Sequence, residues 1–213
     1  MLASVAAGHV KAGRWVLAVA PVIAAVLLMV VFGLAGGGAA ATRPATNPAV
    51  SVPGLLRASD AGAGWTATHS GALVAEPAGC FHPRASMIAS GPRSLVGIVL
   101  TGPGGLPQVD EIVARYATSS EAAAGYASVE RTLDGCTGLV PADLAVTADR
   151  SAAALVTTPF ASGTNGGSET AGVDFVVAQK GTGVVLLAYG SAGVPDAAGV
   201  SRLADRAVER LGP

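Results

Sequence analysis

Two cysteines and two histidines are the residues of this sequence that offer the most chemistry. Cys80 lies in "PAGCFHPR" and Cys136 in "LDGCTG". His69 and His82 are the only histidines that follow the long apolar run at 15–35. No C-x-x-C or H-x-x-x-H pair is present, which disfavours a redox pair and a zinc site built from these four residues. In an oxidising compartment the two cysteines would most simply form one intrachain disulfide. Free or intermolecular thiols stay as the alternative.

Catalytic motifs are absent from the sequence. There is no G-x-S-x-G motif, and no spacing links His69 or His82 to a serine and an acid as in a triad. The Gly-rich "GPGG" at 102–105 lacks the Lys-Ser/Thr of a phosphate loop, so it predicts a turn. We therefore expect no enzyme activity, no metal and no cofactor. An exported envelope hydrolase that uses His69 or His82 is the alternative.

Charged residues supply weaker candidates for binding. Arg115 and the adjacent Tyr116 are the candidate ligand-binding residues, suited to an anionic ligand, although a solvated arginine is the simpler interpretation. The neighbouring carboxylates Asp110 and Glu111 could bind a cation, but such pairs usually face solvent, and we expect that here. The formal net charge is −1, so nothing predicts a nucleic-acid partner.

The N-terminal region predicts a membrane anchor. Residues 15–35 carry no charge and would span about 30 Å as a helix, the thickness of a hydrocarbon core. Lys11 and Arg14 precede this run, so the positive-inside rule predicts a cytoplasmic tail at 1–14 and an extracytoplasmic remainder. The alternative is a signal peptide cleaved near Ala41, which would release a secreted protein. The lipid bilayer is thus the first predicted partner.

A stalk and one folded domain should follow the anchor. Residues 36–53 are rich in Gly, Ala, Pro and Thr, which predicts a flexible stalk, and 54–213 is long enough for one domain. The abundance of Ala, Gly and Arg is typical of a GC-rich, actinobacterial source. An extracytoplasmic domain would permit the Cys80–Cys136 disulfide, which would stabilise it by roughly 4 kcal/mol.

The apolar periodicity of 54–213 predicts mostly strands and two long helices. "TSSE" at 118–121 is a capping box that begins a helix, and Gly135 should end it. Asp196 should cap a second amphipathic helix that runs to Leu211. A short helix is expected near 54–60 and loops at 71–93 and 161–172. Strands are expected at 65–70, 94–102, 108–118, 143–160, 171–181 and 183–191, the last two joined as a hairpin. The stretch 108–118 also fits a helical face, and a strand is favoured there because a well-signalled helix follows it.

These elements predict the α+β class. We expect an antiparallel sheet of five or six strands, with two long helices packed on one face of it.

The order of elements resembles the PknH-like extracellular sensor domain of mycobacteria and related actinobacteria. The similar features are "LLRASDAGAGW", the following Cys80, "VARYATSSEAAAGYASVERTLDGC" up to Cys136, and the terminal "VSRLADRAVERL". The resemblance covers about residues 54–212. It implies a cleft between sheet and helices that binds an undefined extracellular ligand. The family's second disulfide and its kinase domain have no counterpart here.

The function expected from the sequence is therefore a membrane-anchored, extracytoplasmic, non-catalytic sensor-like domain. It would bind an unidentified envelope or extracellular ligand and act with a membrane signalling partner. A structural or interaction protein of a cell-envelope complex is a further alternative.

Overall fold

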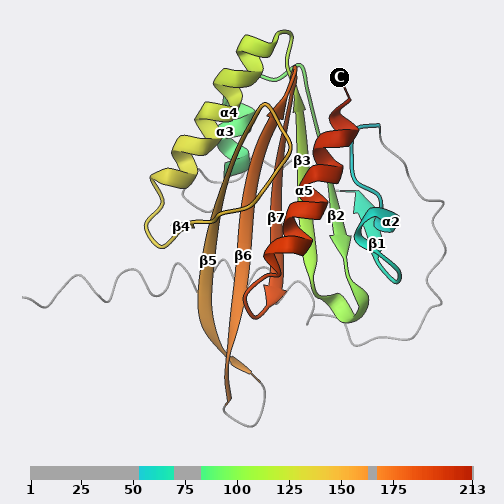
Figure 1. The fold of residues 1–213 in the computed structure, drawn as a ribbon, viewed down its shortest axis with the longest axis vertical. Helices are drawn as coiled ribbons and strands as arrows, with labels where there is room; N and C mark the ends of the chain where they lie inside the picture. Colours follow the sequence, from blue (N-terminus) through green and yellow to red (C-terminus); the bar gives the residue numbers. More distant parts are fainter. Residues whose placement is uncertain (1–52, 70–82, 163–166, 213) are drawn as a thin grey trace, which may run out of the picture. The chain divides into compact units, whose positions relative to one another are not determined.

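The structure is a computed structural model that describes residues 53–69, 83–162 and 167–212. This part of the chain forms a seven-stranded antiparallel sheet with the strand order β1-β2-β3-β7-β6-β5-β4 (Figure 1). The predicted α+β class is confirmed, with seven strands in place of five or six. The strands are β1 (Thr66–His69), β2 (Ser94–Thr101), β3 (Gln108–Arg115), β4 (Val140–Pro141), β5 (Arg150–Ser162), β6 (Gly167–Lys180) and β7 (Gly183–Ala192).

Four α-helices accompany these strands in the described residues. They are α2 (Ala58–Ala61), α3 (Pro83–Ala89), α4 (Ser119–Asp134) and α5 (Ala197–Leu211), and a single 3-10 turn spans Pro103–Gly105 between β2 and β3. None of the helices in the described ranges is long and apolar enough to cross a membrane. The predicted tail, anchor and nearly all of the stalk lie outside these ranges, so those predictions stay as they are.

The two long helices cover opposite faces of the sheet. Successive residues of a strand point to opposite sides, and in β3 Val113 joins the buried cluster with α5 whereas Ile112 joins the cluster with α3 and α4. The prediction that the helices share one face is therefore wrong. The reason lies in the central strands: "VVLLA" at 184–188 is apolar at every position, so both of its faces need cover.

Local sequence signals set the ends of both long helices as predicted. Thr118 Oγ1 accepts a hydrogen bond from Glu121 N–H at 3.1 Å, and the Glu121 carboxylate accepts one from Thr118 N–H at 3.2 Å. Asp196 accepts a hydrogen bond from Gly199 N–H at 3.0 Å at the start of α5. These caps satisfy backbone N–H groups that the first helical turn leaves without partners.

Residues 142–149 differ from the strand predicted at 143–160. They run as an extended strap beside α5, and Leu144, Val146 and Ala148 pack against the cluster under that helix. Thr147 N–H donates to Asp205 Oδ1 on α5 at 2.7 Å. The alternating pattern is real, but among residues 142–149 the backbone bonds to the sheet are at the two ends, from Ala142 N–H to Ala153 and from Asp149 N–H to Gln179.

Two predicted loops contain regular secondary structure instead. The loop expected at 161–172 is mostly strand, because β5 and β6 pair as far as Ser162 and Gly167. A partner strand satisfies the backbone there although the side chains are polar. The loop expected at 71–93 contains α3, whose Met87 is fully buried.

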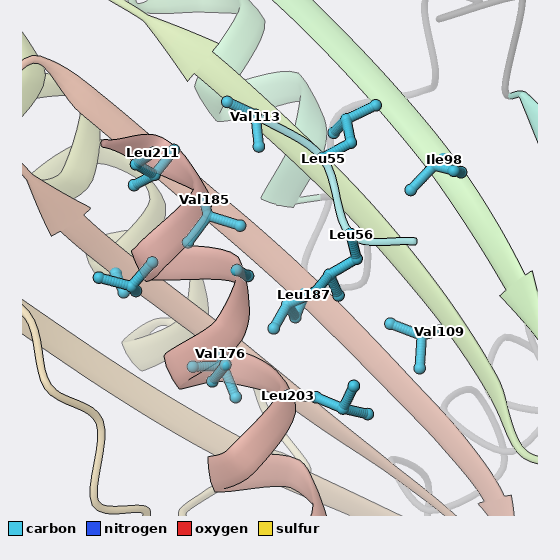
Figure 2. Close-up of a cluster of buried hydrophobic side chains, with 14 of the residues drawn as sticks. Leu55, Leu56, Ile98, Val109, Val113, Val176, Val185, Leu187, Leu203 and Leu211 are labelled. Atoms are coloured by element: carbon cyan, nitrogen blue, oxygen red, sulfur yellow. The ribbon is translucent and has the colours of Figure 1, made fainter. Parts of the chain in front are cut away.

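The segment before β1 is part of the core. Leu55 and Leu56 are each 1% exposed and lie against Ile98 of β2 and Leu187 of β7, as Figure 2 shows. We call residues 54–61 the N-terminal segment. Its packing places the start of the domain over the centre of the sheet, on the same face as α5.

Candidate functional site

Arg115 and Tyr116, the candidate ligand-binding pair, lie on opposite faces of the sheet. Tyr116 belongs to the buried cluster under α3 and α4. The Arg115 guanidinium lies on the α5 face, within 3.2 Å of the position that a Cβ on Gly54 would take. The two side chains therefore form no single site, and their role in binding stays a prediction.

Tyr116 has a structural environment. Its hydroxyl lies 2.6 Å from Ser90 Oγ, and its ring packs directly on Gly125 of α4. Ser90 Oγ in turn donates to the Met87 carbonyl of α3 at 2.6 Å. Burial raises the pKa of Tyr116. The tyrosine thus joins the sheet to both helices of this face.

Arg115 is half-buried at the end of β3. Besides Gly54, its guanidinium lies close to Gly183 of β7, where the side chain of Leu211 also packs. No carboxylate of the described residues is close enough to form an ion pair with it. This leaves a cation at the point where the N-terminal segment, the β6–β7 hairpin and the end of α5 meet.

The residue that the sequence analysis missed is Glu111. It was expected to face solvent with Asp110, yet it is 0% exposed, at the centre of β3. Its signal was present in "VDEIVAR": Val109, Glu111 and Val113 share one face of the strand, and the two valines face the core. Strand periodicity therefore predicts an inward-facing carboxyl at this position.

The Glu111 carboxyl holds the N-terminal segment by a backbone hydrogen bond. Leu56 N–H donates to Glu111 Oε2 at 2.7 Å. The other oxygen, Oε1, is buried and has no hydrogen-bond partner among the described residues. A buried carboxyl that lacks a second partner is costly in its ionised form.

An ion pair beside Glu111 joins the same segment to α5. Arg210 donates to both oxygens of Asp60, from Nε at 2.8 Å and from Nη2 at 2.7 Å. The Asp60 carboxylate also accepts from Arg57 N–H at 2.7 Å. Two parallel bonds from a guanidinium fix geometry as well as charge. The N-terminal segment is thus held to β3 by Glu111 and to α5 by Asp60.

The pKa values of these groups move in opposite directions. Burial raises the pKa of Glu111 to about 8, although the Leu56 hydrogen bond and Arg210 favour its ionised form, and the negative charges of Asp60 and Asp110 add to the rise. Burial also opposes ionisation of Asp60, but its bonds with Arg210 and Arg57 outweigh this and lower its pKa. Glu111 is therefore the member that exchanges a proton near neutrality.

The N-terminal segment encloses Glu111 on the α5 face of the sheet. Glu111 is covered by Leu56 and by the side chains of the α5 cluster, so a substrate could not reach it in this conformation. The hydrogen bond from Leu56 N–H ties the surroundings of Glu111 to the N-terminal segment. In the described ranges no group of three His, Cys, Asp or Glu side chains is arranged to hold a metal ion.

A second buried carboxyl lies on the same face of the sheet. Asp174 of β6 is 4% exposed and pairs across the strands with Tyr189 of β7. Burial raises the pKa of both groups. Sequence reasoning did not single out either residue, although "GVDFVV" places Asp174 among apolar neighbours in the same way as Glu111.

The cysteines and histidines are only partly within the described residues. Cys136 is buried just after the end of α4, where the sequence placed it. His69 ends β1 and pairs with Ile98 of β2. Cys80 and His82 lie in the undescribed range 70–82, so the disulfide stays a prediction.

Comparison with known proteins shows a similarity of fold. No protein-family model and no curated protein matches this sequence. The fold is similar to the crystal structure of the extracellular domain of PknH from Mycobacterium tuberculosis, with a TM-score of 0.55 and 13% identity over 73% of this chain and 93% of that chain. At this identity the likeness shows a shared fold, and it supports the resemblance noted in the sequence at that level.

Proposed function

We propose that this protein is an extracytoplasmic, sensor-like module that binds an envelope or extracellular ligand and has no catalytic activity of its own. The observation that carries the proposal is the fold, which is similar to an extracellular domain over nearly the whole of that domain. In this chain, the domain that has this fold is preceded by the apolar run at 15–35, which we propose as an uncleaved membrane anchor.

The N-terminal segment gives this module a route for output. Residues 54–61 follow the proposed stalk directly, and they dock on the sheet through Leu55, Leu56, Glu111 and the Asp60–Arg210 ion pair. A change that alters this docking would reach the anchor along the chain. We propose that a membrane signalling partner reads that change.

The Arg115 guanidinium is our proposed contact for the ligand. It is a half-buried cation at the junction of three elements, with no carboxylate paired to it in the described residues, so it suits a carboxylate or phosphate group. Tyr116 is not retained in this role, because its hydroxyl and ring are used between the sheet, α3 and α4.

Native mass spectrometry of the full-length chain from its own envelope tests this proposal. We expect a co-purifying anionic small molecule on the wild type, and its loss from Arg115→Gln. Arg93→Gln is the matched control, because Arg93 is an exposed arginine just before β2. Retention of the same molecule by Arg115→Gln would exclude Arg115, and its absence from the wild type would contradict ligand binding.

A further inference from the structure

The N-terminal segment is docked over a fully buried carboxyl, of which one oxygen accepts from Leu56 N–H and the other has no hydrogen-bond partner among the described residues. We propose that docking of residues 54–61 is controlled by the proton on Glu111, so that the domain releases this segment as the surrounding pH rises. The inference rests on the proposed function, because it names a regulation of the segment that leads to the proposed anchor.

The hydrogen bonding and burial of Glu111 depend on whether the N-terminal segment is docked. Leu56 donates its N–H to Glu111 at 2.7 Å, and the Leu56 side chain is itself 1% exposed. Removing the segment from the sheet would take away this donor and open Glu111 to water. Docked and undocked states therefore offer the carboxyl two different environments, one apolar and one aqueous.

Charged groups on several elements act on Glu111, although Asp110 points to the opposite face of β3. Asp60 lies on the segment, Arg210 on α5 and Asp110 on β3 itself, and Arg57 acts on Asp60. The residues paired with Glu111 on β2 and β7 are Ile98 and Leu187, which carry no charge. The Asp60–Arg210 pair stays ionised across the neutral range, so its charges cancel while Glu111 changes.

The sign of the pH effect follows from linkage. The docked Glu111 has a pKa of about 8, whereas a glutamate that is fully exposed to water has a pKa of about 4.5. Between these values the docked state holds the protonated acid and an undocked state holds the carboxylate. Raising the pH across this window therefore favours undocking, and the docking equilibrium can change by up to about three-thousandfold.

Hydrogen exchange of the full-length chain in detergent micelles tests this directly. Protection factors of the amides at 54–61 would be measured from about pH 5.5 to about pH 8.5 and corrected for the intrinsic pH dependence of exchange. We expect wild-type protection to fall at least tenfold over this range, while amides in the centre of α5 keep theirs. The second condition separates local release from global unfolding.

Two glutamine variants assign the effect. Glu111→Gln should have pH-independent protection of residues 54–61. Glu130→Gln, the same change on α4, should behave like the wild type, because Glu130 accepts its hydrogen bond from Tyr126, at 3.0 Å, on the face of the sheet opposite to residues 54–61. A flat wild-type profile, or an unchanged slope in Glu111→Gln, would overturn the proposal.

A second variant covers the case in which Glu111→Gln does not fold. Asp60→Asn removes a negative charge beside Glu111 and frees Arg210, so the midpoint of the wild-type transition should move to lower pH. An unchanged midpoint would also overturn the proposal. Either of these contrary results would leave the proposed ligand binding and export untouched. Native mass spectrometry tests ligand binding, and reporter fusions to the C-terminus test export.

Discussion

Among the described glycines, Gly125 of α4 leaves the least room for a side chain, because Tyr116 packs against it. A Cβ at Gly125 would lie 2.2 Å from the Tyr116 hydroxyl and 2.5 Å from Cζ of its ring. The ring has no room to move, because it is buried and its hydroxyl is bonded to Ser90. A glycine inside α4 is thus required by packing.

Gly125→Ala should therefore destabilise the domain although alanine is the better helix former. Overpacking costs about 1–3 kcal/mol, against about 1 kcal/mol gained in helix propensity. Urea unfolding would measure the difference. Gly190→Ala is the control, because its nearest atoms are 3.9 Å away, and it should be close to neutral. A variant Gly125→Ala at least as stable as the wild type would contradict this packing.

Glu111 shows where sequence reasoning at the residue scale was incomplete. Strand periodicity places Glu111 on the inward face, between Val109 and Val113. The prediction that Glu111 and Asp110 both face solvent did not take this alternation into account. What the sequence could not supply is the partner. The Leu56 N–H lies 55 positions away and approaches only when the N-terminal segment folds over β3.

Among the elements, α4 shows a local signal that acts independently of the fold. Thr118 and Glu121 bond reciprocally at its start, as the "TSSE" motif predicts. Thr118→Ala should lower the free energy of unfolding by about 1 kcal/mol. Urea unfolding again measures it, with Ser120→Ala as the control, since Ser120 is an exposed residue of the first turn. An equal loss in both variants would mean that the cap has no special role.

Elements with strong local signals were predicted, and those that depend on distant partners were not. The β6–β7 hairpin, both caps and the apolar stripe of α5 follow from nearby residues. The strap at 142–149 alternates like a strand, but Thr147 bonds to Asp205 of α5 rather than to a neighbouring strand. The β5–β6 hairpin extends through polar residues because each strand satisfies the other's backbone.

At the scale of the whole molecule, the apolar strands in the centre explain why helices cover both faces. Each face has its own buried cluster, one under α5 and the N-terminal segment and one under α3 and α4. The predicted placement of both helices on one face failed because strand patterns define which residues face inward, but not which side each helix takes. The predicted disulfide would attach the end of α4 to the range 70–82.

We propose above all that this domain lies outside the cytoplasm on an uncleaved anchor. Fusing alkaline phosphatase, which is active only outside the cytoplasm, to the C-terminus of the full-length chain tests it most directly, with a green fluorescent protein fusion as the converse reporter. We predict an active phosphatase, a dark fluorescent fusion, and retention of both in the membrane fraction after an alkaline wash. An inactive phosphatase together with a fluorescent green fluorescent protein fusion would contradict the extracytoplasmic location. An active phosphatase that is released from the membrane would contradict the uncleaved anchor.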